Sequence, residues 1–199
     1  MTEVVLDPGP LPVGPYDKKG PGWWGVLSLI ATEAALFTYL LFSYYFYDLQ
    51  LPHSWRPAEP PKLNLSAPDT LVLLVSSAAV WFAERSLKKG SRSRAGIGIL
   101  VGLILGAIFV VVQIFEWKSK TFTPQTSVYG SIYFTITTFH LAHVLVGLLA
   151  LLFVLIWIAF GYFDNERHAA VSNVVIYWHF VDVVWLFIFS TFYITPYLW

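Results

Sequence analysis

The sequence predicts an all-α fold, an integral membrane bundle of five transmembrane helices with its N-terminus inside and its C-terminus outside. Composition is the first reason: the 199-residue chain is 57% hydrophobic and 12% charged, whereas a soluble domain has about 25% charged residues. The second reason is a succession of apolar runs longer than about 18 residues, the length that crosses a bilayer. A formal net charge of zero offers no surface for nucleic acid.

The expected elements follow in chain order. Residues 1–22 are a Pro- and Gly-rich segment with five prolines and no apolar core, so we do not expect a cleavable signal peptide. Residues 23–199 are predicted to be a single membrane domain. Its spans are expected at about residues 24–47, 67–86, 96–116, 129–160 and 172–195.

Local signals support these boundaries. Pro21 precedes two tryptophans suited to the membrane interface at the start of the first span. "SAPD" fits a capping box at the start of the second span, with Asp69 three residues after Ser66. Pro196 stops the fifth span. The third span carries a stripe of small residues that predicts close helix packing, formed by Gly98, Gly102 and Gly106.

The distribution of lysine and arginine predicts the orientation. Segment 85–94, between spans two and three, contains five of the twelve cationic side chains. Placing this segment inside gives eight cationic side chains inside and four outside, in line with the positive-inside rule. The N-terminus then lies inside and the C-terminus outside.

Polar residues within the spans require an explanation, because a charge at bilayer depth costs at least a few kcal/mol. At a rise of about 1.5 Å per residue, the acids of spans one and five lie at a similar depth, and His143 of span four falls near the same layer. We expect Glu33 to pair with a histidine of span four, His143 first and His140 as the alternative. The predicted buried polar network consists of Glu33, His140, His143, His179 and Asp182, with Glu116 as a separate acid at the outer end of span three.

Several interpretations of this polar set are open on the residues alone. A satisfied hydrogen-bond network that fixes helix register is favoured, and a proton or ion pathway is the next alternative. A metal site is less well supported, since two histidines at i, i+3 are a weak signal. The chain has no cysteine, which excludes disulfides, thiolate ligands and covalent haem attachment.

Four ordered motifs resemble subunit III of the haem–copper oxidase superfamily, over about residues 22–195. They are "LIATEAALF" (29–37), "QIFEW" (113–117), "VYGSIYFTITTFHLAHVLVG" (128–147) and "YWHFVDVVWLF" (177–187). The long form of this family has seven helices, of which the first two form an arm around a lipid-filled cleft. Here the chain is expected to begin at the third, like the short bacterial forms.

The resemblance implies a non-catalytic subunit of a proton-pumping terminal oxidase in the bacterial plasma membrane. Such a subunit packs mainly on subunit I, with subunit II and other oxidase or supercomplex subunits as further partners, and supports proton uptake. Haem and copper are then expected on partner subunits, and this chain is expected to have no catalytic, cofactor-binding or metal-ligating residue. Bound phospholipid is compatible with this interpretation.

Other functions are also compatible with the residues. Within the superfamily, the chain could serve a quinol oxidase or a nitric oxide reductase, because the electron donor binds other subunits. Outside it, the alternatives are a stand-alone transporter that uses the Glu and His set and a membrane metalloenzyme. Many transporters are built from internal repeats, and the sequence shows no clear repeat.

Overall fold

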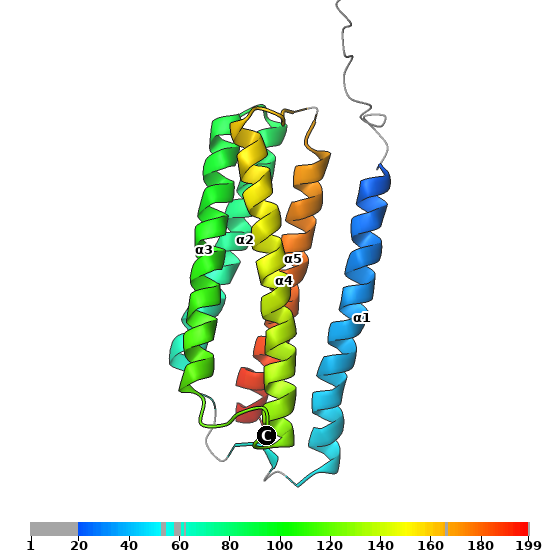
Figure 1. Cartoon of the computed structure of the whole chain (residues 1–199), viewed down its shortest axis with the longest axis vertical. Helices are drawn as coiled ribbons and strands as arrows, with labels where there is room; N and C mark the ends of the chain where they lie inside the picture. The colour runs from blue at the N-terminus through cyan, green and yellow to red at the C-terminus, as the bar shows by residue number, and fades with distance from the viewer. Residues whose placement is uncertain (1–19, 53–54, 58–60, 62, 166, 199) are drawn as a thin grey trace, which may run out of the picture.

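The computed structural model of the chain describes residues 20–52, 55–57, 61, 63–165 and 167–198 (Figure 1). Within these residues the structure has no strand and five long helices: α1 (Pro21–Gln50), α2 (Leu63–Lys88), α3 (Arg92–Ser119), α4 (Val128–Ala159) and α5 (Ala169–Phe189). A π-helical turn and a 3-10 turn continue α5 to Tyr197. All five helices are long and apolar enough to cross a membrane, which confirms the predicted fold class.

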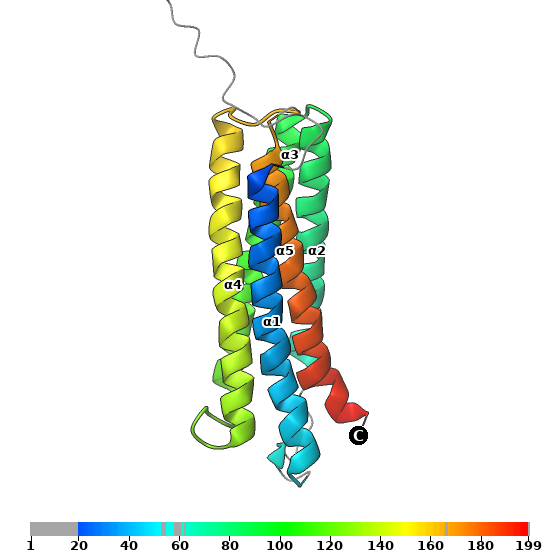
Figure 2. The same cartoon turned by 90° about the vertical axis from the view of Figure 1, so that its right-hand side faces the viewer.

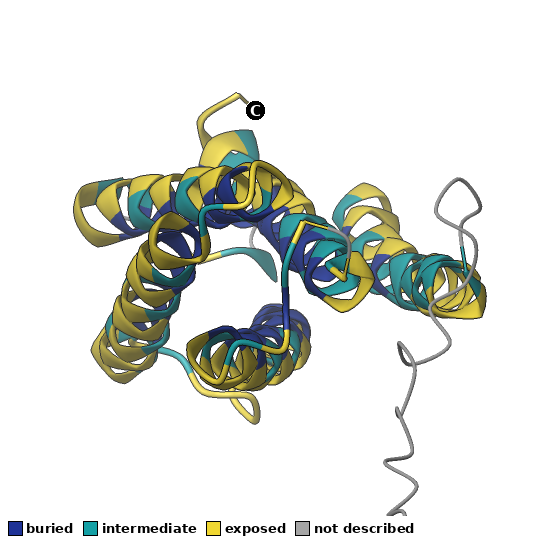
Figure 3. Cartoon of the chain, turned by 90° about the horizontal axis from the view of Figure 1, so that it is seen from above, coloured by how far each residue is buried: buried dark blue, intermediate teal, exposed yellow. Residues whose placement is uncertain are grey.

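The helices run nearly parallel to one another along the long axis of the molecule (Figures 1 and 2). α2 and α3 form an antiparallel hairpin, α4 packs on α3, and α5 packs against both α2 and α4. α1 lies at the edge of the bundle, against α4 and α5, and exposes most of its surface (Figure 3). We call the end that holds the α2–α3 turn the basic end and the opposite end the C-terminal end.

Two glycines with left-handed backbone end the helices at the basic end. Gly90, with φ of 80°, turns the chain from α2 into α3, and Gly161, with φ of 79°, follows α4. The N–H of Gly161 bonds the carbonyl of Ile158 at 3.0 Å, and that of Tyr162 bonds the carbonyl of Trp157 at 3.1 Å. A glycine is favoured after a helix because this conformation closes the last turn without a Cβ clash.

The glycine stripe of α3 faces three neighbouring helices, α2, α4 and α5. A Cβ atom at Gly98 would lie 2.8 Å from Cβ of Ala83 and 2.9 Å from the carbonyl oxygen of Ala79, both on α2. A Cβ at Gly106 would lie 2.7 Å from the Trp178 ring on α5. These positions let helix backbones approach closely, which is how helices associate in lipid.

The start of α2 differs from the prediction. The helix begins at Leu63 rather than near residue 67, and Ser66 and Asp69 lie inside it. The Ser66 hydroxyl is fully buried and donates to Glu116 on α3 instead of capping its own helix. The expected capping box is therefore wrong, because the helix already begins at Leu63 and Ser66 lies within its first turn instead of at the N-cap.

The outward faces of the helices are apolar. On α3, for example, large exposed side chains follow the helix from one end to the other: Ile97, Val101, Ile104, Ile108, Val111 and Phe115. Backbone groups are satisfied within each helix, so such a surface can face hydrocarbon directly.

Candidate functional site

The predicted contact between α1 and α4 is present. Oε2 of Glu33 lies 3.0 Å from Nε2 of His143, and the two side chains are 27% and 15% exposed. The other ring nitrogen of His143, Nδ1, lies 2.6 Å from the carbonyl oxygen of Phe139 in the preceding turn. Phe37 of α1 packs edge-on against the same imidazole, with ring centroids 5.0 Å apart.

A hydrogen bond between these two side chains requires one proton in the contact. A carbonyl oxygen can only accept, so Nδ1 of His143 must donate to Phe139. Nε2 is then either a bare acceptor, for which Glu33 supplies the O–H, or a second N–H that donates to an ionised Glu33. In both arrangements one proton lies in the contact. The pair can therefore hold a proton at the join between α1 and α4.

His140, one turn away on α4, has different surroundings. It is 1% exposed, and neither ring nitrogen has a hydrogen-bond partner among the described residues. Its imidazole stacks on Trp185 at 5.1 Å and meets Phe109 edge-on at 6.0 Å. The structure therefore places His140 in an aromatic cluster and does not join it to the Glu33–His143 pair by a hydrogen bond.

His179 and Asp182 lie between α2 and α5. Nδ1 of His179 is 3.1 Å from the Ser77 hydroxyl, and Asp182 is 7% exposed with no partner for Oδ1 among the described residues. The five residues expected to form one network are thus divided. One group joins α1 to α4, the second joins α2 to α5, and His140 lies among rings.

Glu116 belongs to a larger polar group than the sequence suggested. It is 3% exposed, and its Oε1 accepts hydrogen bonds from Ser66 at 2.8 Å, from Lys120 at 2.8 Å and from the Tyr193 hydroxyl. The hydroxyls of Tyr193 and Tyr133 lie 2.9 Å apart. We call these five residues the Glu116 cluster; it ties α2, α3, α4 and the end of α5 together at the C-terminal end.

Part of this cluster was detectable in the sequence. Glu116 and Lys120 have the i, i+4 spacing of a helical ion pair, with the acid N-terminal to the base as the better orientation requires. Ser66 and Tyr193 come from distant segments and carry no such signal. A second polar contact, at the basic end, was also missed: Glu84 accepts from Ser172 at 2.6 Å and from Lys88 at 2.7 Å.

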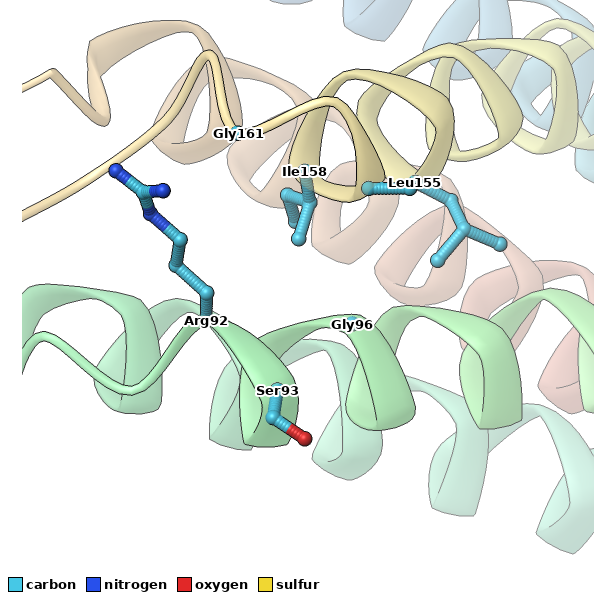
Figure 4. Close-up of a pocket in the computed structure, with 7 residues that line it drawn as sticks. Arg92, Ser93, Gly96, Leu155, Ile158 and Gly161 are labelled. Atoms are coloured by element: carbon cyan, nitrogen blue, oxygen red, sulfur yellow. The ribbon is translucent and has the colours of Figure 1, made fainter.

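An open pocket lies at the basic end, between the start of α3 and the end of α4 (Figure 4). Arg92 and Ser93 line it on one side, and Leu155 and Ile158 line it on the other. None of the polar residues discussed above lines this pocket. Among the described residues, no three His, Cys, Asp or Glu side chains lie close enough to hold a metal ion.

Comparisons with known proteins agree on one family. The family model of cytochrome c oxidase subunit III matches residues 18–199. The chain is 34% identical over 177 residues to cytochrome c oxidase subunit 3 of Loxodonta africana, an alignment that covers 85% of this chain and 68% of the relative. With the same coverage, the proteins of the same name from Drosophila melanogaster and Papio hamadryas are 33% and 35% identical.

Proposed function

Because the chain belongs to the cytochrome c oxidase subunit III family, we propose that it is the non-catalytic subunit III of a proton-pumping cytochrome c oxidase. In this role it packs mainly on subunit I, and it also meets subunit II and other oxidase or supercomplex subunits. Haem and copper lie on those partner subunits. The relatives compared are named after cytochrome c oxidase, which favours cytochrome c over quinol as the electron donor.

The Glu33–His143 pair is the observation that supports a role in proton uptake. It is a hydrogen-bonded acid and imidazole within the apolar part of the bundle, and it remains partly exposed between α1 and α4. Polar groups at such depth are costly and usually mark a pathway or a contact. We propose that the pair stabilises the α1–α4 join and helps to keep protons available to the uptake path of the partner subunit.

The location we propose is the bacterial plasma membrane, following the resemblance of the sequence motifs to bacterial members of the family. The basic end, with the cationic segment 85–94, then faces the cytoplasm. Phospholipid is expected along the exposed apolar faces of the helices. α1 has the smallest buried share of the five helices, with Phe37 and Tyr44 as its buried residues.

Removing the chain from the purified oxidase tests this function. Optical bands of haem and copper should be unchanged, while proton delivery slows and activity decays earlier during turnover. In the intact complex, Glu33→Gln should shorten the working life in the same direction. Glu84→Gln is the matched control, because Glu84 lies at the basic end and accepts hydrogen bonds from Lys88 and Ser172. This variant should leave the working life unchanged. Loss of a haem or copper band on removal of this chain alone would overturn the proposal.

A further inference from the structure

Five buried polar atoms in and next to the Glu116 cluster have no hydrogen-bond partner among the described residues. They are Oδ1 and Oδ2 of Asp69, Oε1 and Nε2 of Gln113, and Oε2 of Glu116. The three side chains are 2%, 1% and 3% exposed. Buried polar groups in native proteins are nearly always paired with protein atoms or ordered water. Three adjacent side chains with unpaired atoms therefore indicate a ligand.

The helix register brings these side chains together. The hydrogen bond from Ser66 to Glu116 aligns antiparallel α2 and α3 at the C-terminal end. Asp69 follows Ser66 by three residues on α2, and Gln113 precedes Glu116 by three residues on α3. Because the helices are antiparallel, both residues lie farther from the C-terminal end than the Ser66–Glu116 bond. Residues three apart on a helix share a face, so Asp69 and Gln113 lie on the facing sides of the two helices, one turn below the Ser66–Glu116 bond.

Hydrogen-bond donors distinguish the two acids. Oε1 of Glu116 accepts hydrogen bonds from Ser66, Lys120 and Tyr193, so this acid already has a cationic partner. Asp69 receives no hydrogen bond from the described residues. The Lys120 ammonium balances the charge of Glu116, so an ionised Asp69 would be a second, uncompensated charge in a buried site.

The groups that face this site come from four elements. α2 contributes Asp69, and α3 contributes Glu116 with Lys120 at its end. α4 contributes Tyr133, and the π-helical turn after α5 contributes Tyr193. Both tyrosines are neutral hydroxyl donors in these contacts. The site therefore has no net charge when Lys120 is charged and one of the two acids, Asp69 or Glu116, is protonated.

We propose that Asp69, Gln113 and Glu116 form a proton-binding site, in which Asp69 carries the proton and internal water links it to Gln113 and to Oε2 of Glu116. An internal water typically makes about three hydrogen bonds to buried polar groups. The five unpaired atoms supply such partners, with donors and acceptors among them. The site lies at the C-terminal end of the bundle and is separate from the Glu33–His143 pair.

Infrared difference spectroscopy on the full chain, purified in its native membrane complex, tests this site. A protonated carboxylic acid has a C=O stretching band apart from those of carboxylates and amides. The wild-type spectrum minus that of Asp69→Asn should show this band, and the band should shift in D₂O. Asp164→Asn is the matched control, because Asp164 lies in a loop and pairs with Arg167. Its difference spectrum should lack the band.

A second variant keeps the proposal testable if Asp69→Asn does not assemble. Lys120→Met removes the cation that balances Glu116, so the site should take up another proton and the acid band should grow.

A high-resolution cryo-EM map of the same complex should show water density within hydrogen-bonding distance of Asp69 and Gln113. Equal acid bands in wild type and Asp69→Asn, or no gain in Lys120→Met, would overturn the proton site. A map in which the three side chains form direct hydrogen bonds with one another would contradict the proposed internal water.

Discussion

Oε2 of Glu33 on α1 and Nε2 of His143 on α4 are 3.0 Å apart, although the two residues are separated by 110 positions in the chain. α1 lies at the edge of the bundle and buries few side chains, namely Phe37 and Tyr44. The hydrogen bond to α4 therefore has a larger share in attaching α1 than it would have in a tightly packed helix. A second side-chain contact, between Tyr45 and Thr191 at 3.1 Å, attaches α1 to the end of α5.

We expect Glu33→Leu to lower the unfolding free energy by about 1 kcal/mol, the net value of a typical hydrogen bond. Glu33→Gln should lower the unfolding free energy by less, because the amide N–H of glutamine can still donate to His143. The measurement is thermal unfolding of the purified complex in detergent. Ser43→Ala on the same helix is the control, since the Ser43 hydroxyl donates to the carbonyl of Tyr39 within α1 and to no other helix among the described residues. Unchanged stability in Glu33→Leu would show that the contact does not hold α1.

The glycines of α3 give a prediction about packing. Gly98→Ala should destabilise the protein by about 1–3 kcal/mol, as overpacking generally does. The new Cβ would lie 2.9 Å from the carbonyl oxygen of Ala79, and backbone cannot move aside as a flexible side chain can.

Gly25→Ala on α1 is the matched control for this substitution. Among the described residues, no heavy atom outside its chain neighbours and the backbone of its own helix lies within 4 Å of the position that its Cβ would take. The higher helix propensity of alanine, worth about 1 kcal/mol, should make this change neutral or stabilising. Both variants are compared by thermal unfolding, and equal effects would contradict close packing of α2 on α3.

Much of the fold could be predicted because it depends on local hydropathy. Five apolar runs specify five helices, and a rise of about 1.5 Å per residue was sufficient to place Glu33 at the depth of His143. The start of α2 could not be predicted in this way. Ser66 has the local signature of a cap, and its bond to Glu116 depends on the packing of another helix.

The candidate site was harder to predict for the same reason. His140 and His143 look equivalent in the sequence, one turn apart on one helix. Their surroundings differ because Trp185 and Phe109 cover His140, whereas α1 brings a carboxylate to His143. The burial of Glu116 likewise depends on Tyr193, whose position follows from the π-helical turn at the end of α5.

Topology gives a further prediction. A reporter that is active only in the cytoplasm should be active when inserted after Gly90, between α2 and α3, and inactive when fused after Trp199. The reason is the concentration of cationic side chains in segment 85–94, which resists translocation. Cytoplasmic activity at Trp199 would contradict the inside location of the basic end.

The segment that follows α1 gives the last prediction. Asp48, near the end of α1, accepts hydrogen bonds from Nε of Arg56 at 2.6 Å and from the Trp55 indole at 3.0 Å. The carboxylate raises the pKa of Arg56, so the guanidinium stays charged. Trp55 also packs on Tyr44 and Tyr129, with ring centroids 5.5 Å and 5.6 Å apart. Asp48 thus anchors residues 55 and 56 at the C-terminal end, beside Tyr44 and Tyr129.

Asp48→Asn should release this anchor, because an amide cannot form the charged, two-pronged contact with a guanidinium. Charged hydrogen bonds are worth about 1.5–3 kcal/mol, so the backbone N–H of Trp55, bonded to the carbonyl of Pro52 at 2.9 Å, should exchange with deuterium at least roughly tenfold faster. Asp164→Asn, which breaks an ion pair in the loop before α5, should leave this amide unaffected. An unchanged exchange rate at Trp55 in Asp48→Asn would show that ring packing alone holds the segment, and that the ion pair is dispensable.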